Sequence, residues 1–307
     1  MRMRRLIGIL AVMSVLLGIA ILLYNPLQNH LTQDDMNREI EAFEQAIDSN
    51  QSDVTQEEQK IEKAYQSLRE EMELYNTELF ENKQAGLVDA WSYEQAAFDF
   101  SEYGLPTEVV GILYIPAMNE RLPVYLGATR ENLARGVAVL GQTSMPVGGI
   151  NTNCVIAGHR GYKGVPFFRD IEKLKPGDQI YLTTHWETKV YEVESMAIIQ
   201  PDSTEAVLIQ KGRELLTLIT CHPYNTATHR YVVYCTLAED EITDLEQSES
   251  NSEADHSTED QQMEESFSQQ LIQLEQWLPI LAVPLVTIIV LVLVWTKKKG
   301  TRRNEKE

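Results

Sequence analysis

The spacing of apolar residues changes near residue 109, and this change divides the chain. Beyond it, short runs rich in β-branched and aromatic residues alternate with turn-rich pieces such as Lys175-Pro-Gly-Asp178. Eight such runs at this spacing predict a mainly β fold, a small closed or partly closed β-barrel. The runs cover residues 109–115, 122–126, 137–140, 154–157, 179–183, 189–199, 215–220 and 231–237. Two pieces between them, 167–174 and 203–210, are predicted to be short helices.

Ahead of the barrel, apolar residues recur at helical spacing. Ile61, Leu68 and Met72 belong to one apolar stripe, and Ile40 and Phe43 belong to an earlier one. A polar Ser-Asn-Gln-Ser-Asp piece separates the two stripes. We therefore predict a helical segment over residues 25–84. The pattern leaves two arrangements open, a solvated stalk and a pair of packed helices.

An uncharged apolar run lies near each end of the chain, at residues 6–24 and 277–295. Each is close to the roughly 20 residues that a transmembrane helix needs. The flanking residues 1–5 and 296–307 are basic, which predicts that both ends are cytoplasmic and the rest of the chain extracytoplasmic. We therefore expect two transmembrane helices anchoring the protein to the lipid bilayer of the cell membrane. A cleaved signal peptide is the alternative for the first run.

Charge narrows the possible partners. The chain has 26 Lys+Arg against 46 Asp+Glu, a formal net charge of -20. Because phosphate binding requires clustered cations, this balance argues against nucleic acid as a partner. Residues 241–276 form an acidic, apolar-poor tract that is predicted to be a disordered tether. No His, Cys or Asp cluster has metal-ligand spacing and no Gly-rich phosphate loop is present, so we expect neither a metal nor a cofactor.

Cys221 is the residue with the clearest potential for chemistry. It follows the strand-like run 214–220 and precedes Pro223 closely, a position that would hold a side chain rigidly yet open to substrate. A thiol is mostly un-ionised at neutral pH and needs a base or positive neighbours to react. His159 could exchange protons with it, and Arg230 could stabilise an oxyanion.

Spacing alone leaves other assignments open. His222 and His229 are nearer to Cys221 in the sequence than His159 is, and Arg160 and Arg169 compete with Arg230. A buried strand thiol with no chemical role is also compatible with the composition.

Three segments together resemble a known family. Thr217-Leu-Ile-Thr-Cys221, Ala157-Gly-His-Arg-Gly161 and Arg230-Tyr-Val-Val are similar to the signature segments of the sortases, Gram-positive surface transpeptidases with an eight-stranded β-barrel. The resemblance spans residues 109–237, within a catalytic barrel that we place at 100–240. It implies that Cys221 is the nucleophile, His159 the general acid/base and Arg230 the oxyanion-binding residue.

Two hydrophobic ends and a helical segment before the barrel resemble the class C sortases, which build pili. Those enzymes carry a lid with an Asp-Pro-aromatic motif over the active site. Here Asp89 and Trp91 match the motif, but Ala90 replaces the proline. We therefore predict a lid at residues 85–95, with a less restrained backbone because the proline is absent. A plain loop packed on the barrel is the alternative.

The segment after Cys221 departs from the class C pattern. Pilus enzymes usually read Thr-Cys-Thr-Pro-Tyr-Gly-x-Asn-Thr-His-Arg, whereas this chain reads Cys221-His-Pro-Tyr-Asn-Thr-Ala-Thr-His-Arg230. The Cys-to-Arg spacing is kept, but the glycine and the asparagine are replaced. Since this loop lies beside the substrate groove in the family, Thr220, His222 and Tyr224 are candidate groove residues.

Cys154 and Cys235 are predicted to be core thiols on the two strands flanking that of Cys221. Two strands separated by a third lie about 9–10 Å apart, beyond the reach of a disulfide. An exported domain with three cysteines is also no disulfide scaffold.

The resemblance implies a reaction. Cys221 would cleave an LPxTG-like sorting signal through a thioacyl intermediate, and a lysine amine of a pilin would resolve it as an isopeptide bond. The implied partners are pilins or other surface proteins bearing a sorting signal. Two alternatives remain: a housekeeping sortase that anchors proteins to the cell wall, and a membrane-tethered binding module without enzymatic activity.

Overall fold

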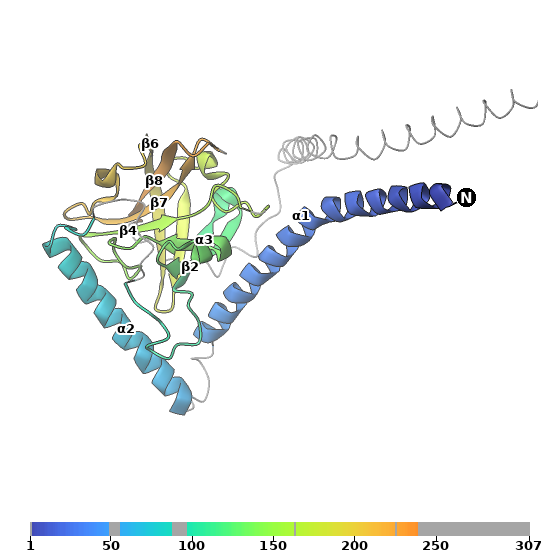
Figure 1. Ribbon diagram of the computed structural model, residues 1–307. Coiled ribbons are helices and arrows are strands. Elements are labelled where there is room, and N and C mark those ends of the chain that lie inside the picture. Colours follow the sequence, from blue (N-terminus) through green and yellow to red (C-terminus); the bar gives the residue numbers. More distant parts are fainter. Residues whose placement is uncertain (1, 49–55, 88–96, 163, 225, 239–307) are drawn as a thin grey trace, which may run out of the picture. The chain divides into compact units, whose positions relative to one another are not determined.

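The computed structural model describes residues 2–48, 56–87, 97–162, 164–224 and 226–238 of the 307 in the chain (Figure 1). The predicted tether at 241–276, the second apolar run and the basic tail lie outside these residues. So do Asp89 and Trp91 of the predicted lid. The barrel and the parts of the preceding helices from residue 27 onward belong to one compact unit, Leu27–Glu241.

Eight strands close into a barrel, which confirms the predicted fold. In barrel order the neighbours are β1-β2-β3-β4-β7-β8-β6-β5, with β2–β3 and β4–β7 parallel and the other pairs antiparallel. The strands are β1 (Gly111–Ile115), β2 (Glu120–Leu126), β3 (Val137–Val139), β4 (Thr152–Ala157), β5 (Gln179–Thr184), β6 (Thr188–Ile199), β7 (Glu214–His222) and β8 (His229–Leu237).

Strand β7 is buried on both of its faces, which explains its unbroken apolar sequence. Leu216 and Leu218 point into the main barrel core. Ile219 points to the other face, into a separate cluster with Ala157 of β4 and Val232 of β8. Successive strand residues face opposite sides, so a strand covered on both sides reads as a continuous hydrophobic run rather than an alternating one.

Short helices connect the strands. The 3-10 helices η3 (Ile171–Lys173) and η4 (Thr204–Val207) fall within the two pieces predicted to be helical. Two further helices, η2 (Pro116–Met118) and α3 (Arg130–Arg135), were not predicted, because neither is long enough to show an apolar period. The local signal for α3 is its N-cap, where the Thr129 hydroxyl accepts a hydrogen bond from the Asn132 amide at 3.0 Å.

The helices before the barrel pack against it rather than forming a solvated stalk. They are α1 (Arg2–Asp48) and α2 (Gln56–Glu81). Leu68 and Met72 of α2 are fully buried in the main barrel core. Ile40 and Phe43 of α1 join a cluster on the outside of β1–β3. Both helices therefore bury apolar residues against the barrel, an arrangement that the apolar stripes alone did not specify.

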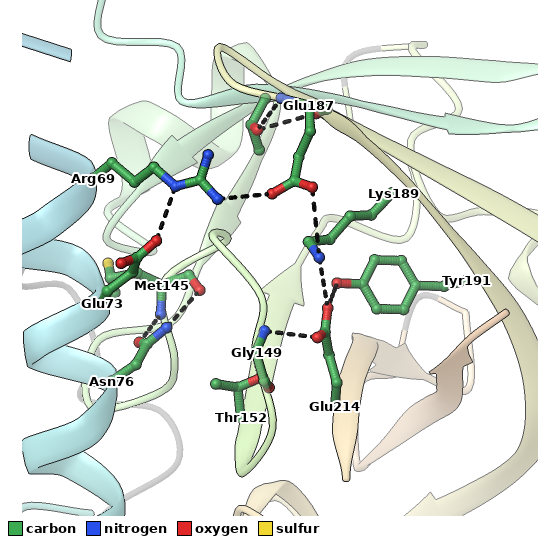
Figure 2. Close-up of polar contacts among 11 residues, drawn as sticks. Arg69, Glu73, Asn76, Met145, Gly149, Thr152, Glu187, Lys189, Tyr191 and Glu214 are labelled. Carbon is green, nitrogen blue, oxygen red and sulfur yellow. Dashed lines mark hydrogen bonds and ion pairs between the residues drawn. The ribbon is translucent and has the colours of Figure 1, made fainter. Parts of the chain in front are cut away.

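A chain of alternating charges also ties α2 to the barrel (Figure 2). Arg69 of α2 bonds Glu187 at 3.2 Å, Lys189 lies 3.8 Å from Glu187, and Lys189 reaches Glu214 at 3.3 Å. The Glu214 carboxylate, only 9% exposed, also accepts the Gly149 amide at 2.6 Å. A carboxylate this buried requires such partners, because an unpaired buried charge is costly.

The turn between β5 and β6 docks on α2 through a buried histidine. His185 stacks on Tyr65 with ring centroids 3.4 Å apart, and its side chain is 5% exposed. Trp186 donates its indole hydrogen to the Tyr65 carbonyl at 3.3 Å. Burial lowers the pKa of His185, and a contact with Glu62 offsets part of that effect. The docked state therefore favours neutral His185.

Acidification is expected to weaken this docking. The stability that neutral His185 contributes is present above the ordinary histidine pKa of about 6.5 and is lost as the pH falls below it, since only the unfolded state then gains the proton freely. His185→Phe keeps the stacking on Tyr65 but cannot be protonated. The melting temperature should therefore fall less in the variant than in the wild type when the pH is lowered from 7.5 to 5.5. Equal falls would contradict this account.

The membrane spans stay predictions. Within the part of the chain that the structure describes, none of the helices has the length and apolar character needed to span a membrane. Residues 6–24 lie within α1, and residues 277–295 lie outside the described part.

Candidate active site

Three neighbouring strands bring Cys221, Arg230 and His159 toward one another. In the antiparallel pair β7–β8, Cys221 lies directly opposite Arg230. In the parallel pair β4–β7, Ala157 lies beside Ile219, and the Gly158 amide still donates to the Ile219 carbonyl at 3.1 Å. His159 follows Gly158 in the chain, and Cys221 lies two residues after Ile219, so the same register brings His159 beside Cys221. The barrel thus aligns three residues that are as far as 71 positions apart in the chain.

The turn that carries His159 is held by close packing at Gly158. A Cβ atom there would lie 2.7 Å from the Phe168 ring and 2.9 Å from Val137, so a larger residue does not fit. The Thr220 hydroxyl, buried on β7, donates to the Gly158 carbonyl at 2.7 Å. Because Thr220 immediately precedes Cys221, this bond fixes the histidine turn against the strand that carries the thiol.

His159 lies in an aromatic setting. Its ring stacks on Tyr162 with centroids 4.7 Å apart and meets the edge of Phe167 at 6.4 Å. Burial lowers the pKa of His159. The imidazole is therefore neutral at neutral pH and able to accept a proton, as a general base must be.

Cys221 is the accessible thiol of the three. It is partly exposed, whereas Cys154 and Cys235 are buried and all three are free. Leu216 of β7 lies between Cys154 and Cys235 in the sheet, which confirms that the two are core thiols on separated strands. Burial raises the pKa of both core thiols, so they stay protonated and unreactive.

Arg230 is anchored at the edge of the loop that follows the thiol. One of its guanidinium nitrogens, Nη1, donates to the main-chain carbonyls of Ala227 at 3.0 Å and His229 at 2.9 Å. The side chain is partly buried. The guanidinium carries a permanent positive charge, which suits binding to an anionic centre.

The competing residues lie in different surroundings. His222 and His229 are the next pair along β7 and β8, so they face the opposite side of the sheet from Cys221 and Arg230. Arg160 is buried and bonded to Glu172 at 2.7 Å. Arg169 is 45% exposed and lies 3.8 Å from Asp170. Geometry therefore favours His159 and Arg230 as partners of Cys221, while their chemical roles stay predictions.

The candidate groove residues occupy three different environments. Thr220 is buried and uses its hydroxyl within the fold. His222 is part-buried and contacts Arg160. Tyr224 is 50% exposed and packs close to Gly161, so it joins the loop after the thiol to the turn after His159. Of these three, Tyr224 has the exposure that a substrate contact requires.

Glu172 is a residue of this region that sequence reasoning missed. It lies in η3 and contacts both Arg160 and His222, at 2.7 and 3.1 Å. Nothing in the local pattern marks it, since it reads as an ordinary charged residue in a short helix. Among the residues that the structure describes, no three His, Cys, Asp or Glu side chains gather as they would around a metal ion.

Comparison with known proteins gives consistent matches. Residues 113–238 match the family model of the sortase domain. Sortase A of Bacillus anthracis is 32% identical over 158 residues, which cover 50% of this chain and 72% of that protein.

Two solved structures are similar over a longer stretch. Sortase C1 of GBS pilus island 1 has a TM-score of 0.57 at 28% identity, covering 68% of this chain and 95% of that one. Sortase C of Streptococcus pneumoniae, whose structure is described as informative on catalysis and pilin substrate specificity, has a TM-score of 0.54 at 28% identity. That match covers 66% of this chain and 96% of the other.

Proposed function

The chain belongs to the sortase family of cysteine transpeptidases, and we propose that it is a pilus-building member that joins pilin subunits through lysine isopeptide bonds. The observation that carries this proposal is the similarity to sortase C1 of GBS pilus island 1, which extends over 95% of that structure. The pneumococcal sortase C, described with reference to its pilin substrate, supports the same choice.

In the proposed first step, Cys221 attacks the threonyl carbonyl carbon of an LPxTG-like sorting signal. The carbonyl carbon bonds to Sγ, and the carbon–nitrogen bond to glycine breaks. His159, neutral before the reaction, takes up the thiol proton and delivers it to the departing amine. The C-terminal part of the signal leaves, and the surface protein stays attached to Cys221 as a thioester.

In the second step a lysine amine of the next pilin attacks the thioester. His159 removes a proton from that amine, a carbon–nitrogen isopeptide bond forms, and the thiolate leaves with a proton from the imidazole. Arg230, opposite Cys221 across the β7–β8 ladder, stabilises the oxyanion that forms in each step. Electrostatic stabilisation of this kind is the usual source of a large share of the rate enhancement.

Two further parts of the proposal concern regions flanking the barrel. Residues 6–24 and 277–295 would anchor both ends in the membrane, so that the enzyme meets membrane-held substrates in two dimensions. Asp89 and Trp91 would form a lid, the aromatic ring shielding the thiol and the carboxylate pairing with Arg230 at rest. The apolar composition of the two runs supports the membrane anchors, and the match to the Asp-Pro-aromatic motif supports the lid.

A housekeeping role is the second candidate. The observation that favours it is the 32% identity to a relative named sortase A, from Bacillus anthracis, rather than to one named sortase C. In that case the thioester would be resolved by a cell-wall precursor amine instead of a pilin lysine. The two functions therefore differ in the acceptor and not in the first step.

The acceptor decides between them. We expect the enzyme, incubated with a fluorescent LPxTG peptide and a folded pilin domain, to form a branched product at one lysine, located by tandem mass spectrometry. A pilin variant with that lysine replaced by arginine should yield only hydrolysis, because arginine is not nucleophilic at neutral pH. Efficient transfer to a short cell-wall-type diamino peptide, with none to the pilin, would instead support the housekeeping role.

A further inference from the structure

A buried arginine lies beside the candidate catalytic residues without being one of them. The Arg160 side chain is 7% exposed. Its Nη2 meets Glu172 Oε1 at 2.7 Å, and its Nη1 meets Nδ1 of His222 at 2.9 Å. Nε donates to the Arg169 carbonyl at 3.4 Å, and the guanidinium lies 5.9 Å from the centre of the Tyr231 ring. Arg160, Glu172 and His222 form what we call the Arg160 cluster.

The Arg160 cluster joins the two residues that directly follow the proposed acid/base and nucleophile. Arg160 is the residue after His159, and His222 is the residue after Cys221. Because β4 and β7 are parallel and in register at Ala157 and Ile219, Arg160 and His222 meet one residue beyond the catalytic pair. Movement of the histidine turn relative to β7 would therefore stretch the contact between Arg160 and His222.

Glu172 anchors Arg160 to the short helix η3. The hydrogen bond from Arg160 holds the pKa of Glu172 below its ordinary value, so the carboxylate stays charged. A buried guanidinium with a carboxylate partner is strongly favoured over one without it. The short helix η3 thus holds Arg160 in place, and Arg160 in turn holds His222.

We propose that Arg160 is a positioning residue, which sets the placement of His159 relative to Cys221 through its hydrogen bond to His222. The proposal rests on the function proposed above. Placement matters because a misplacement of about 1 Å in a reacting pair costs up to roughly 100-fold in rate. None of the three side chains of the cluster needs to touch the substrate for this role.

The contact depends on the protonation of His222. Nδ1 can accept from Arg160 only while it carries no proton, which places the proton of the neutral ring on Nε2. A doubly protonated ring would present Nδ1–H to Glu172 Oε1, 3.1 Å away, and would oppose the Arg160 donor. The other ionisable groups near the ring are Tyr231, with ring centroids 5.8 Å apart, and His229, opposite on β8. Protonation would therefore release Arg160 from β7.

Paired substitutions at His222 test the proposal. His222→Asn offers an amide oxygen to Arg160 but cannot be protonated, whereas His222→Leu offers no acceptor. We expect kcat for a sorting peptide to fall about 10-fold in His222→Leu and in Arg160→Gln, with KM changed less than twofold. His222→Asn should restore most of kcat, because its amide oxygen can accept from Arg160. The double variant Arg160→Gln/His222→Leu should be no slower than either single one, because both remove one interaction.

Arg213→Gln is the matched control, since Arg213 pairs with Glu194 at 2.8 Å near the other end of β7. It should leave kcat unchanged. The rate at which iodoacetamide alkylates Cys221 gives a second readout that needs no sorting peptide, and it should change in Arg160→Gln and His222→Leu only. If Arg160→Gln does not fold, the two His222 variants carry the test.

The outcomes separate this inference from the proposed function. Unchanged kcat and alkylation rates in His222→Leu, in an enzyme whose turnover requires Cys221, would refute the positioning role and leave the sortase reaction intact. Absence of any Cys221-dependent turnover would refute the proposed function, and the alkylation rates would then decide the positioning role alone. Equal loss in His222→Asn and His222→Leu would also contradict it, because both would then act through lost packing.

Discussion

Replacing Cys221 with alanine is expected to abolish cleavage of a sorting peptide, a loss on the order of 10⁶-fold in kcat if the thiol and imidazole act as a unit. The alanine variant has no atom that can form the thioester, and no other thiol is placed to substitute for it. Cys154 and Cys235 are buried, and burial raises the pKa of each. Chromatography of the peptide products measures the rate of cleavage. Intact mass spectrometry of the protein shows whether the acyl-enzyme forms.

Two controls make this result specific. Cys154→Ala and Cys235→Ala remove core thiols and should keep turnover, with only a modest fall in melting temperature. In the native wild type, iodoacetamide should add one label, and Cys221→Ala should take none. Labelling of the alanine variant to the same extent as the wild type would contradict the assignment of Cys221 as the catalytic thiol.

Replacing Arg230 with glutamine is expected to lower kcat by roughly 10²- to 10³-fold, with a smaller effect on KM. This is the usual cost of removing one donor from an oxyanion-binding site, about 3–4 kcal/mol of transition-state stabilisation. Glutamine keeps hydrogen-bond donors but loses the charge, and Arg230→Lys keeps the charge but loses the planar fork. We expect lysine to recover only part of the rate.

Arg169→Gln is the matched control for Arg230. Arg169 is a half-exposed arginine of the same region, paired with Asp170, and its loss should change kcat less than threefold. Melting curves are needed beside the kinetics, because Arg230 also bonds the Ala227 and His229 carbonyls. A large rate loss in Arg169→Gln with little in Arg230→Gln would reverse the assignment of the two arginines.

Much of the barrel could be predicted because strands are marked by patterns in their own local sequence. Apolar runs bounded by turns marked all eight strands, and β7 was visible as an unbroken run because it is covered on both faces. Helix α3 was missed, because six residues cannot display a 3.6-residue period. The choice between a solvated stalk and a packed helical pair was also left open, since an apolar stripe does not identify what packs on it.

The three main residues of the candidate site could be predicted from the sequence, but their arrangement in space could not. Cys221, His159 and Arg230 came from matching three segments in order, whereas their alignment depends on pairing β4 with β7 across some 60 intervening residues. Pairings of that range follow from the whole fold and not from either segment. Glu172 could not be found, because its importance lies in the side chains it meets, Arg160 and His222, and not in its own sequence surroundings.

The position of β7 in the sheet has a mechanical consequence. It is paired with β4 from Glu214 to Ile219 and with β8 from Leu215 to His222, so that both edges of the strand are bonded. A protein held on Cys221 and pulled along the strand axis would load these two ladders in shear, where the hydrogen bonds resist together instead of peeling apart one by one. An acyl-enzyme pulled through its bound substrate would thus bear the load on a strand that is hydrogen-bonded along both of its edges.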